Sequence, residues 1–128
     1  VDVGTVRTGV AASDPDRVLA YPVETLPAPG LDRVAELVGE LEAVLVVVGL
    51  PVSLSGKAAS ASAELARGFA RELASLVAPV PVELVDERLT TVVAASALRA
   101  AGRSSRASRQ RIDQAAAVTL LQGVLDRP

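Results

Sequence analysis

The chain has 128 residues, of which half are apolar, with one Tyr, one Phe and a formal net charge of −2. This length suits a single domain spanning residues 1–128 and is too short for two independent cores. Because the chain has neither Cys nor His, disulfides, thiolate or histidine metal sites and Ser-His-Asp catalysis are excluded, so acid–base or metal chemistry must use carboxylates.

The first part of the chain predicts three short strands, at residues 1–4, 8–13 and 18–26. Gly4 ends the first strand, and the turn-prone residues 14–16 end the second. Short runs joined by tight breaks are typical of an antiparallel meander. We therefore expect these three strands to pair in chain order.

From residue 31 the apolar residues recur with the period of a helix. The apolar run at 44–49 does not alternate, which is typical of a strand buried on both faces. The elements predicted from residue 31 onward are a helix at 31–41, a strand at 44–49, a helix at 61–77, a strand at 82–86, a helix at 90–101, a loop at 103–111 and a helix at 113–125. This order predicts an α/β fold with a mixed five-stranded sheet, in which three antiparallel strands precede a βαβαβ unit and helices flank the sheet.

Three carboxylates stand at the ends of predicted elements. Asp2 lies in the first strand, Glu87 follows the last strand, and Asp113 begins the last helix. The C-terminal ends of parallel strands form the ligand crevice of an open α/β sheet, so these acids could share that crevice. Carboxylates brought together repel one another unless a cation neutralises them, and their oxygens suit Mg²⁺ or Mn²⁺. We therefore expect all three to be catalytic residues and metal ligands of a two-metal-ion hydrolase.

Each acid also has a plain structural interpretation. Asp2 could be a strand-end residue, Glu87 could form a surface ion pair with Arg88, and Asp113 could cap its helix. Taken one at a time, the acids do not decide between the catalytic and the structural interpretation. The sequence motifs around them provide the stronger evidence.

Four motifs carry a resemblance to a known family. Residues 2–11 read DVGTVRTGVA, residues 49–51 read GLP, residues 86–91 read DERLTT, and residues 113–122 read DQAAAVTLLQ. In this order they resemble the YqgF/RuvX family, whose members are described as Holliday junction resolvases and as pre-16S ribosomal RNA nucleases. The resemblance covers nearly the whole chain.

The resemblance implies a ribonuclease H-like fold and places the family's acidic triad on the three carboxylates named above. It further implies that Gly4 allows close backbone approach near metal and phosphate. Arg7 and Arg88 become candidates for phosphate contact, because a guanidinium matches phosphate geometry, although either could instead pair with a neighbouring acid. Family members often carry Asn or a longer polar run after the GLP motif, whereas residues 52–57 here read VSLSGK, which leaves the role of the 52–60 loop open.

An arginine-rich stretch without acids contains Arg99, Arg103, Arg106, Arg109 and Arg111. As a functional element, this stretch would follow a nucleic-acid backbone, and binding would fall steeply with salt. Otherwise it is a solvated loop. The chain has too few aromatic residues for a base-stacking platform, so recognition should depend on shape and charge.

The resulting hypothesis is a Mg²⁺- or Mn²⁺-dependent phosphodiester hydrolase, a nuclease that processes the end of pre-16S ribosomal RNA. One alternative is a Holliday junction resolvase acting on branched DNA, which would need a two-fold dimer for paired cuts. A second is a non-catalytic nucleic-acid-binding factor in ribosome assembly. A third is a phosphotransferase of the actin-like kind, suggested by the D-x-G opening but disfavoured by the short chain.

The partner expected in either leading interpretation is nucleic acid, as structured RNA or branched DNA. No apolar run reaches the roughly 20 residues needed to span a bilayer, and no signal-peptide pattern opens the chain. We expect a cytoplasmic protein without a membrane partner, acting as a monomer or a weak homodimer.

Overall fold

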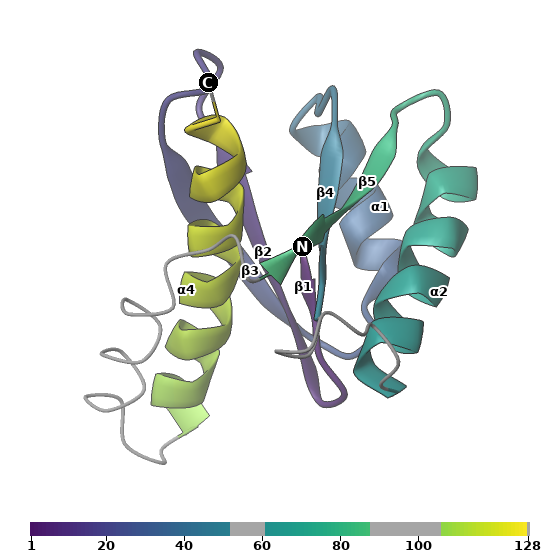
Figure 1. The fold of residues 1–128 in the computed structure, drawn as a ribbon, viewed down its shortest axis with the longest axis vertical. Helices are drawn as coiled ribbons and strands as arrows, with labels where there is room; N and C mark the ends of the chain where they lie inside the picture. Colours follow the sequence, from purple (N-terminus) through teal and green to yellow (C-terminus); the bar gives the residue numbers. More distant parts are fainter. Residues whose placement is uncertain (52–60, 88–105, 128) are drawn as a thin grey trace.

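The computed structural model describes residues 1–51, 61–87 and 106–127, and of residues 106–113 it describes the backbone alone. Figure 1 shows the arrangement of the elements within these ranges. In chain order they are β1 (Asp2–Val3), β2 (Arg7–Ser13), β3 (Ala20–Pro27), α1 (Leu31–Glu40), β4 (Val46–Leu50), α2 (Ala61–Val77), β5 (Val82–Asp86) and α4 (Arg106–Leu125). The predicted helix at 90–101 and the 52–60 loop lie outside the described residues.

The described strands form two hydrogen-bonded groups. β1, β2 and β3 pair antiparallel in chain order, which confirms the predicted meander, and β4 pairs parallel with β5. Two backbone hydrogen bonds connect the groups: the nitrogen of Val1 donates to the carbonyl of Val47 at 2.6 Å, and the N–H of Gly49 donates to the carbonyl of Val1 at 3.0 Å. This is the pattern of parallel neighbours with Val1 opposite Val48, so β1 lies beside β4.

Helices α1 and α2 pack on one face of these strands (Figure 1). The buried face of α2 presents Phe69, Leu73 and Val77, which share a core cluster with Val34 of α1 and Val48 of β4. Leu73 and Val48 are fully buried. This cluster is aliphatic apart from Phe69, in keeping with a composition that contains almost no aromatic residues.

Helix α4 lies on the opposite face of β4. Leu120 packs against Val47 and Val85, whose side chains point away from α1 and α2 because successive residues of a strand face opposite sides. β4 is therefore buried on both faces, as its continuous apolar run predicts.

The helix α4 begins earlier than the sequence pattern predicts. Residues 106–111, which the sequence analysis assigns to a loop, are helical and continuous with the predicted helix from Asp113. The reason is that Arg, Ala and Gln favour a helix intrinsically even where no apolar periodicity marks one.

The C-terminal part of α4 is fixed to the β2–β3 hairpin by Gln122. Its side chain donates to the carbonyl of Val18 and accepts from the N–H of Ala20, both at 2.9 Å. The hairpin itself is closed by Asp14, whose carboxylate accepts hydrogen bonds from the N–H groups of Val18 and Leu19. The glutamine of the closing DQAAAVTLLQ motif therefore has a structural role.

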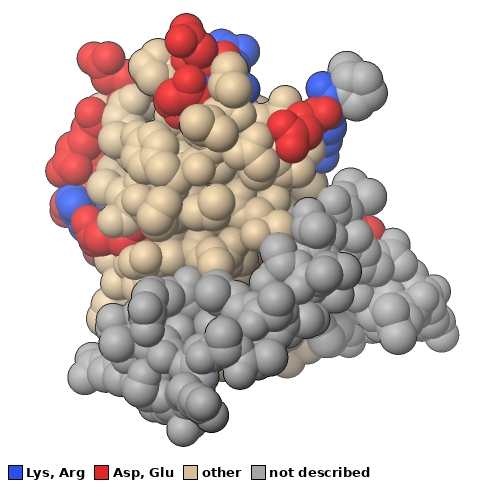
Figure 2. Space-filling model, turned by 90° about the vertical axis from the view of Figure 1, so that its left-hand side faces the viewer, with Lys and Arg blue, Asp and Glu red and all other residues tan. Residues whose placement is uncertain are grey.

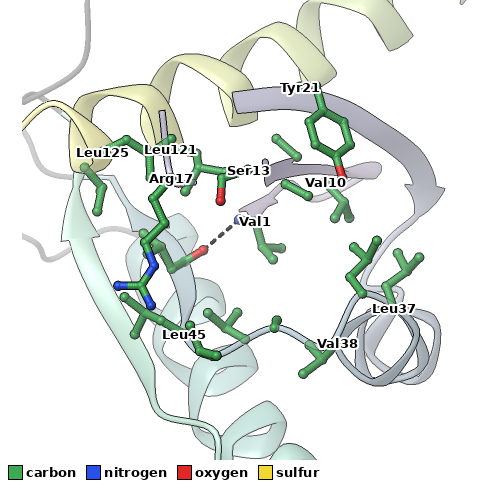
Figure 3. A pocket seen from close by; sticks show the side chains of 18 of the residues that line it. Val1, Val10, Ser13, Arg17, Tyr21, Leu37, Val38, Leu45, Leu121 and Leu125 are labelled. Carbon is green, nitrogen blue, oxygen red and sulfur yellow. Dashed lines mark hydrogen bonds between the residues drawn. The ribbon is translucent and has the colours of Figure 1, made fainter. Parts of the chain in front are cut away.

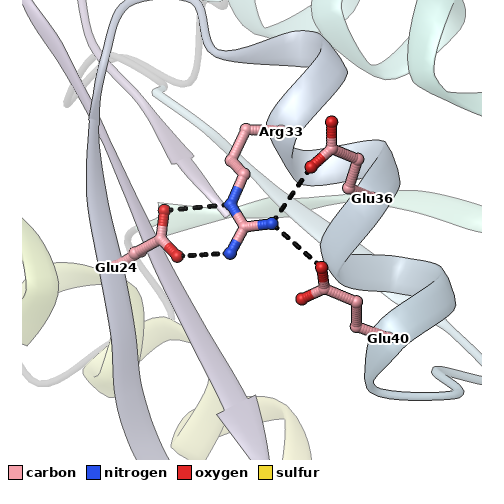
Figure 4. A network of polar contacts seen from close by, with 4 residues as sticks. All are labelled: Glu24, Arg33, Glu36 and Glu40. Carbon is pink, nitrogen blue, oxygen red and sulfur yellow. Dashed lines mark hydrogen bonds and ion pairs between the residues drawn. The ribbon is translucent and has the colours of Figure 1, made fainter.

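Strand β3 and helix α1 are connected by a polar network centred on Arg33 (Figure 4). Its guanidinium binds both carboxylate oxygens of Glu24 and also contacts Glu36 and Glu40. The hydrogen bonds from Arg33 lower the pKa of Glu24. Because the side chains of Arg33 and Glu24 are each 36% exposed, solvent screens the pair and its contribution to stability is small.

The side of the molecule on which α4, β2 and β3 lie presents a broad uncharged area with acidic side chains along its margin (Figure 2). Exposed apolar residues of the hairpin include Val18, Leu19 and Tyr21. None of the helices in the described ranges combines the length and the apolar character that crossing a membrane requires.

Candidate active site

Asp2 is held in the middle of the fold by the strands on either side of β1. It pairs with Gly9 of β2, and its neighbour Val1 is hydrogen bonded to β4 on the other side. In the parallel register set by Val1, Asp2 lies opposite Gly49. Its side chain therefore shares the face of Gly49, which is the face covered by α4. Asp2 is half-buried.

The turn that follows β1 requires a glycine. The N–H of Gly4 donates to the carbonyl of Arg7 at 2.9 Å, and a Cβ on Gly4 would lie 2.5 Å from that same oxygen. Real Cβ atoms are not found so close to a backbone oxygen. The geometry of this turn therefore explains why position 4 is a glycine, without any role in binding metal or phosphate.

Glu87 lies over Gly49. It directly follows β5 and is half-buried, and a Cβ built on Gly49 would come within 2.7 Å of its Oε1 and 3.0 Å of Leu120 Cδ2. The space that a side chain at position 49 would take is therefore occupied by Glu87 from β5 and Leu120 from α4. The absence of a side chain at Gly49 lets the Glu87 carboxylate lie over β4, the strand next to β1.

Asp2 and Glu87 act on the same neighbouring group. The nitrogen of Val1 is buried, and the negative charges of Asp2 and Glu87 both act on it. Both carboxylates are therefore close enough to Val1 to interact with it electrostatically. Two acids remote in sequence thus gather around Val1 and Gly49.

Asp113 lies on α4, four residues before Ala117, which is fully buried. Four residues make about one helical turn, so Asp113 follows the line of Ala117 and Leu120 toward the start of the helix. The side chain of Asp113 is outside the described residues. Among the described side chains, no group of three or more carboxylates forms a metal-binding cluster.

Comparison with known proteins identifies the family. Residues 1–127 match the RuvX family, described as Holliday junction resolvase. The chain belongs to the RuvX family. A protein of Rhodococcus opacus named "Putative pre-16S rRNA nuclease" is 54% identical over 134 residues, covering 98% of this chain and 75% of that protein.

Relatives from other genera of bacteria carry the same name. The protein of Streptomyces coelicolor is 53% identical over 130 residues, covering 98% of this chain and 77% of its own length. That of Mycobacterium ulcerans is 55% identical over 131 residues, covering 99% of this chain and 76% of its own length. Membership of the RuvX family supports a nuclease role.

The predicted phosphate-binding residues of this RuvX chain are only partly described. Arg7 is half-buried at the start of β2, close in sequence to the Gly4 turn. Arg88 and Arg103 lie outside the described residues. Arg106, Arg109 and Arg111 belong to α4, and their side chains are not described.

Sequence reasoning missed the role of Gly49. It treated the GLP motif as the end of a strand, whereas the glycine provides the space for Glu87. A signal was present, because a glycine inside an apolar β-branched run often marks a place where another group approaches the backbone closely.

Proposed function

We propose that this chain is a metal-dependent nuclease of the ribonuclease H-like fold, in which Asp2, Glu87 and Asp113 hold Mg²⁺ or Mn²⁺. The observation that carries the proposal is that Glu87 lies over Gly49 and that Asp2 lies opposite Gly49 in the strand register, both on the face covered by the helix that contains Asp113. In this proposal the two strand groups act as one mixed five-stranded sheet, in the order β3-β2-β1-β4-β5.

The donor set fits these ions. All three residues offer hard carboxylate oxygens, and the chain has no Cys or His that would favour a softer metal. Two carboxylates held close together repel each other, and a bound cation would offset this repulsion. Divalent metal bound here would supply water activation and charge neutralisation for phosphodiester hydrolysis.

Each of the three acids would have a different role in the site. Asp2 is fixed from both sides by β2 and β4, so it is suited to be a rigid ligand. Glu87 has a longer side chain resting over Gly49, so it is suited to be a ligand or to orient the attacking water. Asp113 would complete the set from α4, which is anchored at its other end by Gln122.

For the substrate, we propose the precursor end of 16S ribosomal RNA, on the strength of the relatives above 50% identity that carry that name. Arg7, Arg88 and the arginines at 103, 106, 109 and 111 would contact the phosphates. Phe69 is buried and Tyr21 is the only other aromatic residue, so base stacking would contribute little. Branched DNA is the second candidate, because the family match is described as Holliday junction resolvase.

The test is a cleavage assay on a structured precursor RNA and a four-way DNA junction, with Mg²⁺, Mn²⁺ or EDTA. The parent chain is compared with Asp113→Asn and with Asp32→Asn, which changes an exposed acid on α1. Metal-dependent RNA cleavage that Asp113→Asn abolishes and Asp32→Asn preserves supports the proposal. Cleavage of the junction alone selects the resolvase, and binding of either substrate without cleavage selects the non-catalytic factor.

A further inference from the structure

Asp2 has a glycine on each side of it in the strands. Gly9 of β2 pairs with Asp2, and Gly49 of β4 lies opposite it on the other side. We call these three residues the Asp2 row. The row lies on the face covered by α4, because Val10, the neighbour of Gly9, belongs to the core on the other face. Glu87 fills the space over Gly49. Gly9 is also buried, and the element that packs on β2 at this face is α4.

The contacts of Leu120 show which turn of α4 lies over the Asp2 row. Leu120 packs against Val47 and Val85. Its Cδ2 lies 3.0 Å from the position that a Cβ on Gly49 would take. Helix α4 runs in the opposite direction to β4 (Figure 1), so residues earlier in α4 lie nearer to the C-terminal end of β4. Ala117 comes three residues, or about 4.5 Å, before Leu120. It therefore lies at about the level of the Asp2 row.

The residues at this level allow α4 to come close to the sheet. Ala117 is fully buried although its side chain is a single methyl group. A glycine inside a strand often marks a place where another backbone approaches closely, and Gly9 is such a glycine. The distance between packed elements depends on the size of the side chains at the contact. A glycine opposite an alanine is nearly the smallest contact that a strand and a helix can make.

The C-terminal half of α4 is held differently. Leu121 and Leu125 line a cavity of about 500 Å³ beside Val1 (Figure 3). In this half, hydrogen bonds from Gln122 fix the helix to the β2–β3 hairpin. The position of the half that contains Asp113 depends instead on the packing around Ala117.

We propose that Gly9 is a positioning residue for the metal site, because it lets the turn of α4 next to Asp113 come down on the sheet beside Asp2. Asp113 is four residues before Ala117, about one helical turn, so its distance from Asp2 follows the height of that turn above β2. A methyl group added at position 9 lifts the turn and draws Asp113 away from Asp2. In this role Gly9 itself binds neither metal nor substrate. The inference rests on the metal site proposed above.

The test measures Mn²⁺ affinity by electron paramagnetic resonance and the thermal midpoint for the same set of variants. Gly9→Ala should weaken Mn²⁺ binding by about fivefold and lower the midpoint by roughly 5 °C. In the Asp113→Asn background the same change should weaken binding by less than about twofold, because the residue through which it acts is gone. The control is Gly39→Ala, which adds a methyl group at an exposed place on α1 with nothing within 4 Å, and it should bind Mn²⁺ like the parent.

A compensating change separates positioning from stability. Ala117→Gly removes a methyl group on the helix side, so the double variant of Gly9→Ala with Ala117→Gly should bind Mn²⁺ within about twofold of the parent. Its thermal midpoint should still lie below that of the parent, because a glycine inside a helix is destabilising. If Gly9→Ala alone does not fold, Ala117→Ser enlarges the same contact from the helix side and should weaken Mn²⁺ binding in its place.

Two results would overturn the role of Gly9 alone. One is parent-like Mn²⁺ binding by Gly9→Ala. The other is an equal loss of affinity from Gly9→Ala in the parent and in the Asp113→Asn background, which would mean that position 9 acts on Asp2 directly. A parent chain that binds no Mn²⁺ would overturn the proposed metal site and the role of Gly9 with it. The thermal midpoints would then show by themselves whether positions 9 and 117 are coupled.

Discussion

The two ends of the parallel strands contrast in chemistry although they share one backbone geometry. At the C-terminal end of β4, Gly49 leaves space that Glu87 fills, and Asp2 lies on the same face. At the N-terminal end, aliphatic side chains and strand edges surround a cavity of about 500 Å³. The comparison teaches that the strands set the framework, whereas one glycine and two acids give one end the carboxylates to which we assign the proposed metal.

The largest expected effect concerns the acids. If Asp2 and Glu87 bind the proposed metal, Asp2→Asn and Glu87→Gln should each lower the rate of cleavage by about 100-fold or more, because losing such a ligand removes roughly 3 kcal/mol of transition-state stabilisation. Single-turnover cleavage and thermal unfolding are measured together. The matched control is Glu83→Gln, which changes an exposed residue of β5, the strand that Glu87 directly follows. Its cleavage rate should equal that of the parent. Equal losses of cleavage rate in Glu83→Gln and Glu87→Gln would show that the acids at the C-terminal end of the parallel strands have no special role in cleavage.

A second prediction concerns the turn after β1. Gly4→Ala should destabilise the fold by about 2–3 kcal/mol, because its Cβ would meet the Arg7 carbonyl oxygen at 2.5 Å and that oxygen belongs to the backbone. Gly68→Ala is the control, because a Cβ at this α2 position meets nothing within 4 Å, and should stabilise by about 0.5–1 kcal/mol. Urea unfolding measures both. Equal stability of the two variants would show that the turn is not constrained as described.

Gly49→Ala separates activity from stability. The new Cβ would displace the Glu87 carboxylate, found 2.7 Å away, but this is the end of a flexible side chain that can move. We expect a stability cost of about 1 kcal/mol and a fall in cleavage of about tenfold. Unchanged cleavage with a lowered thermal midpoint would mean that the position of Glu87 does not matter for the reaction.

The hydrogen bonds between Gln122, near the C-terminal end of α4, and the β2–β3 hairpin should affect stability and not cleavage. Gln122→Ala removes hydrogen bonds to Val18 and Ala20 and should cost about 1 kcal/mol, with little change in cleavage. Gln122→Glu keeps the acceptor for Ala20 but places a carboxylate oxygen against the Val18 carbonyl and the Asp126 carboxylate, so it should cost at least as much stability as Gln122→Ala. A large loss of cleavage in Gln122→Ala would show that the two ends are coupled through α4.

The smallest expected effect is a pH dependence at the hairpin. Hydrogen bonds from Leu19 and Val18 lower the pKa of Asp14 below its usual value near 4. The lowered pKa means that Asp14 stabilises the fold at neutral pH, and this contribution is lost as the pH falls through its folded-state pKa. Asp14→Ala should therefore be less stable than the parent at pH 7, with the difference shrinking toward pH 2. A difference that stays constant with pH would contradict this assignment.

Local patterns were sufficient to predict most of the regular elements within the described residues. The helix α2 and the strand β5 have the predicted bounds, because helical periodicity and the prolines at 79 and 81 define them sharply. The meander and the parallel β4–β5 pair also follow from the order of the elements. The start of α4 was wrong, because an Arg-rich segment has strong helix propensity without an apolar stripe.

Contacts between remote segments could not be predicted in the same way. The resemblance selected Asp2, Glu87 and Asp113, but the packing of Glu87 over Gly49 depends on the register between β4 and β5. The hydrogen bonds of Gln122 depend on where α4 meets the hairpin. The cavity beside Val1 depends on how far each strand extends, which periodicity does not give.

The most direct test of the central claim is Mn²⁺ binding measured by electron paramagnetic resonance. The parent chain is compared with Asp2→Asn, Glu87→Gln and Asp113→Asn, and with Asp32→Asn as the control. If the three acids share one site, each of the three substitutions weakens binding by about tenfold or more while the control binds like the parent. Parent-like Mn²⁺ affinity in Asp113→Asn, in a variant that remains folded, would contradict a site built from β1, β5 and α4.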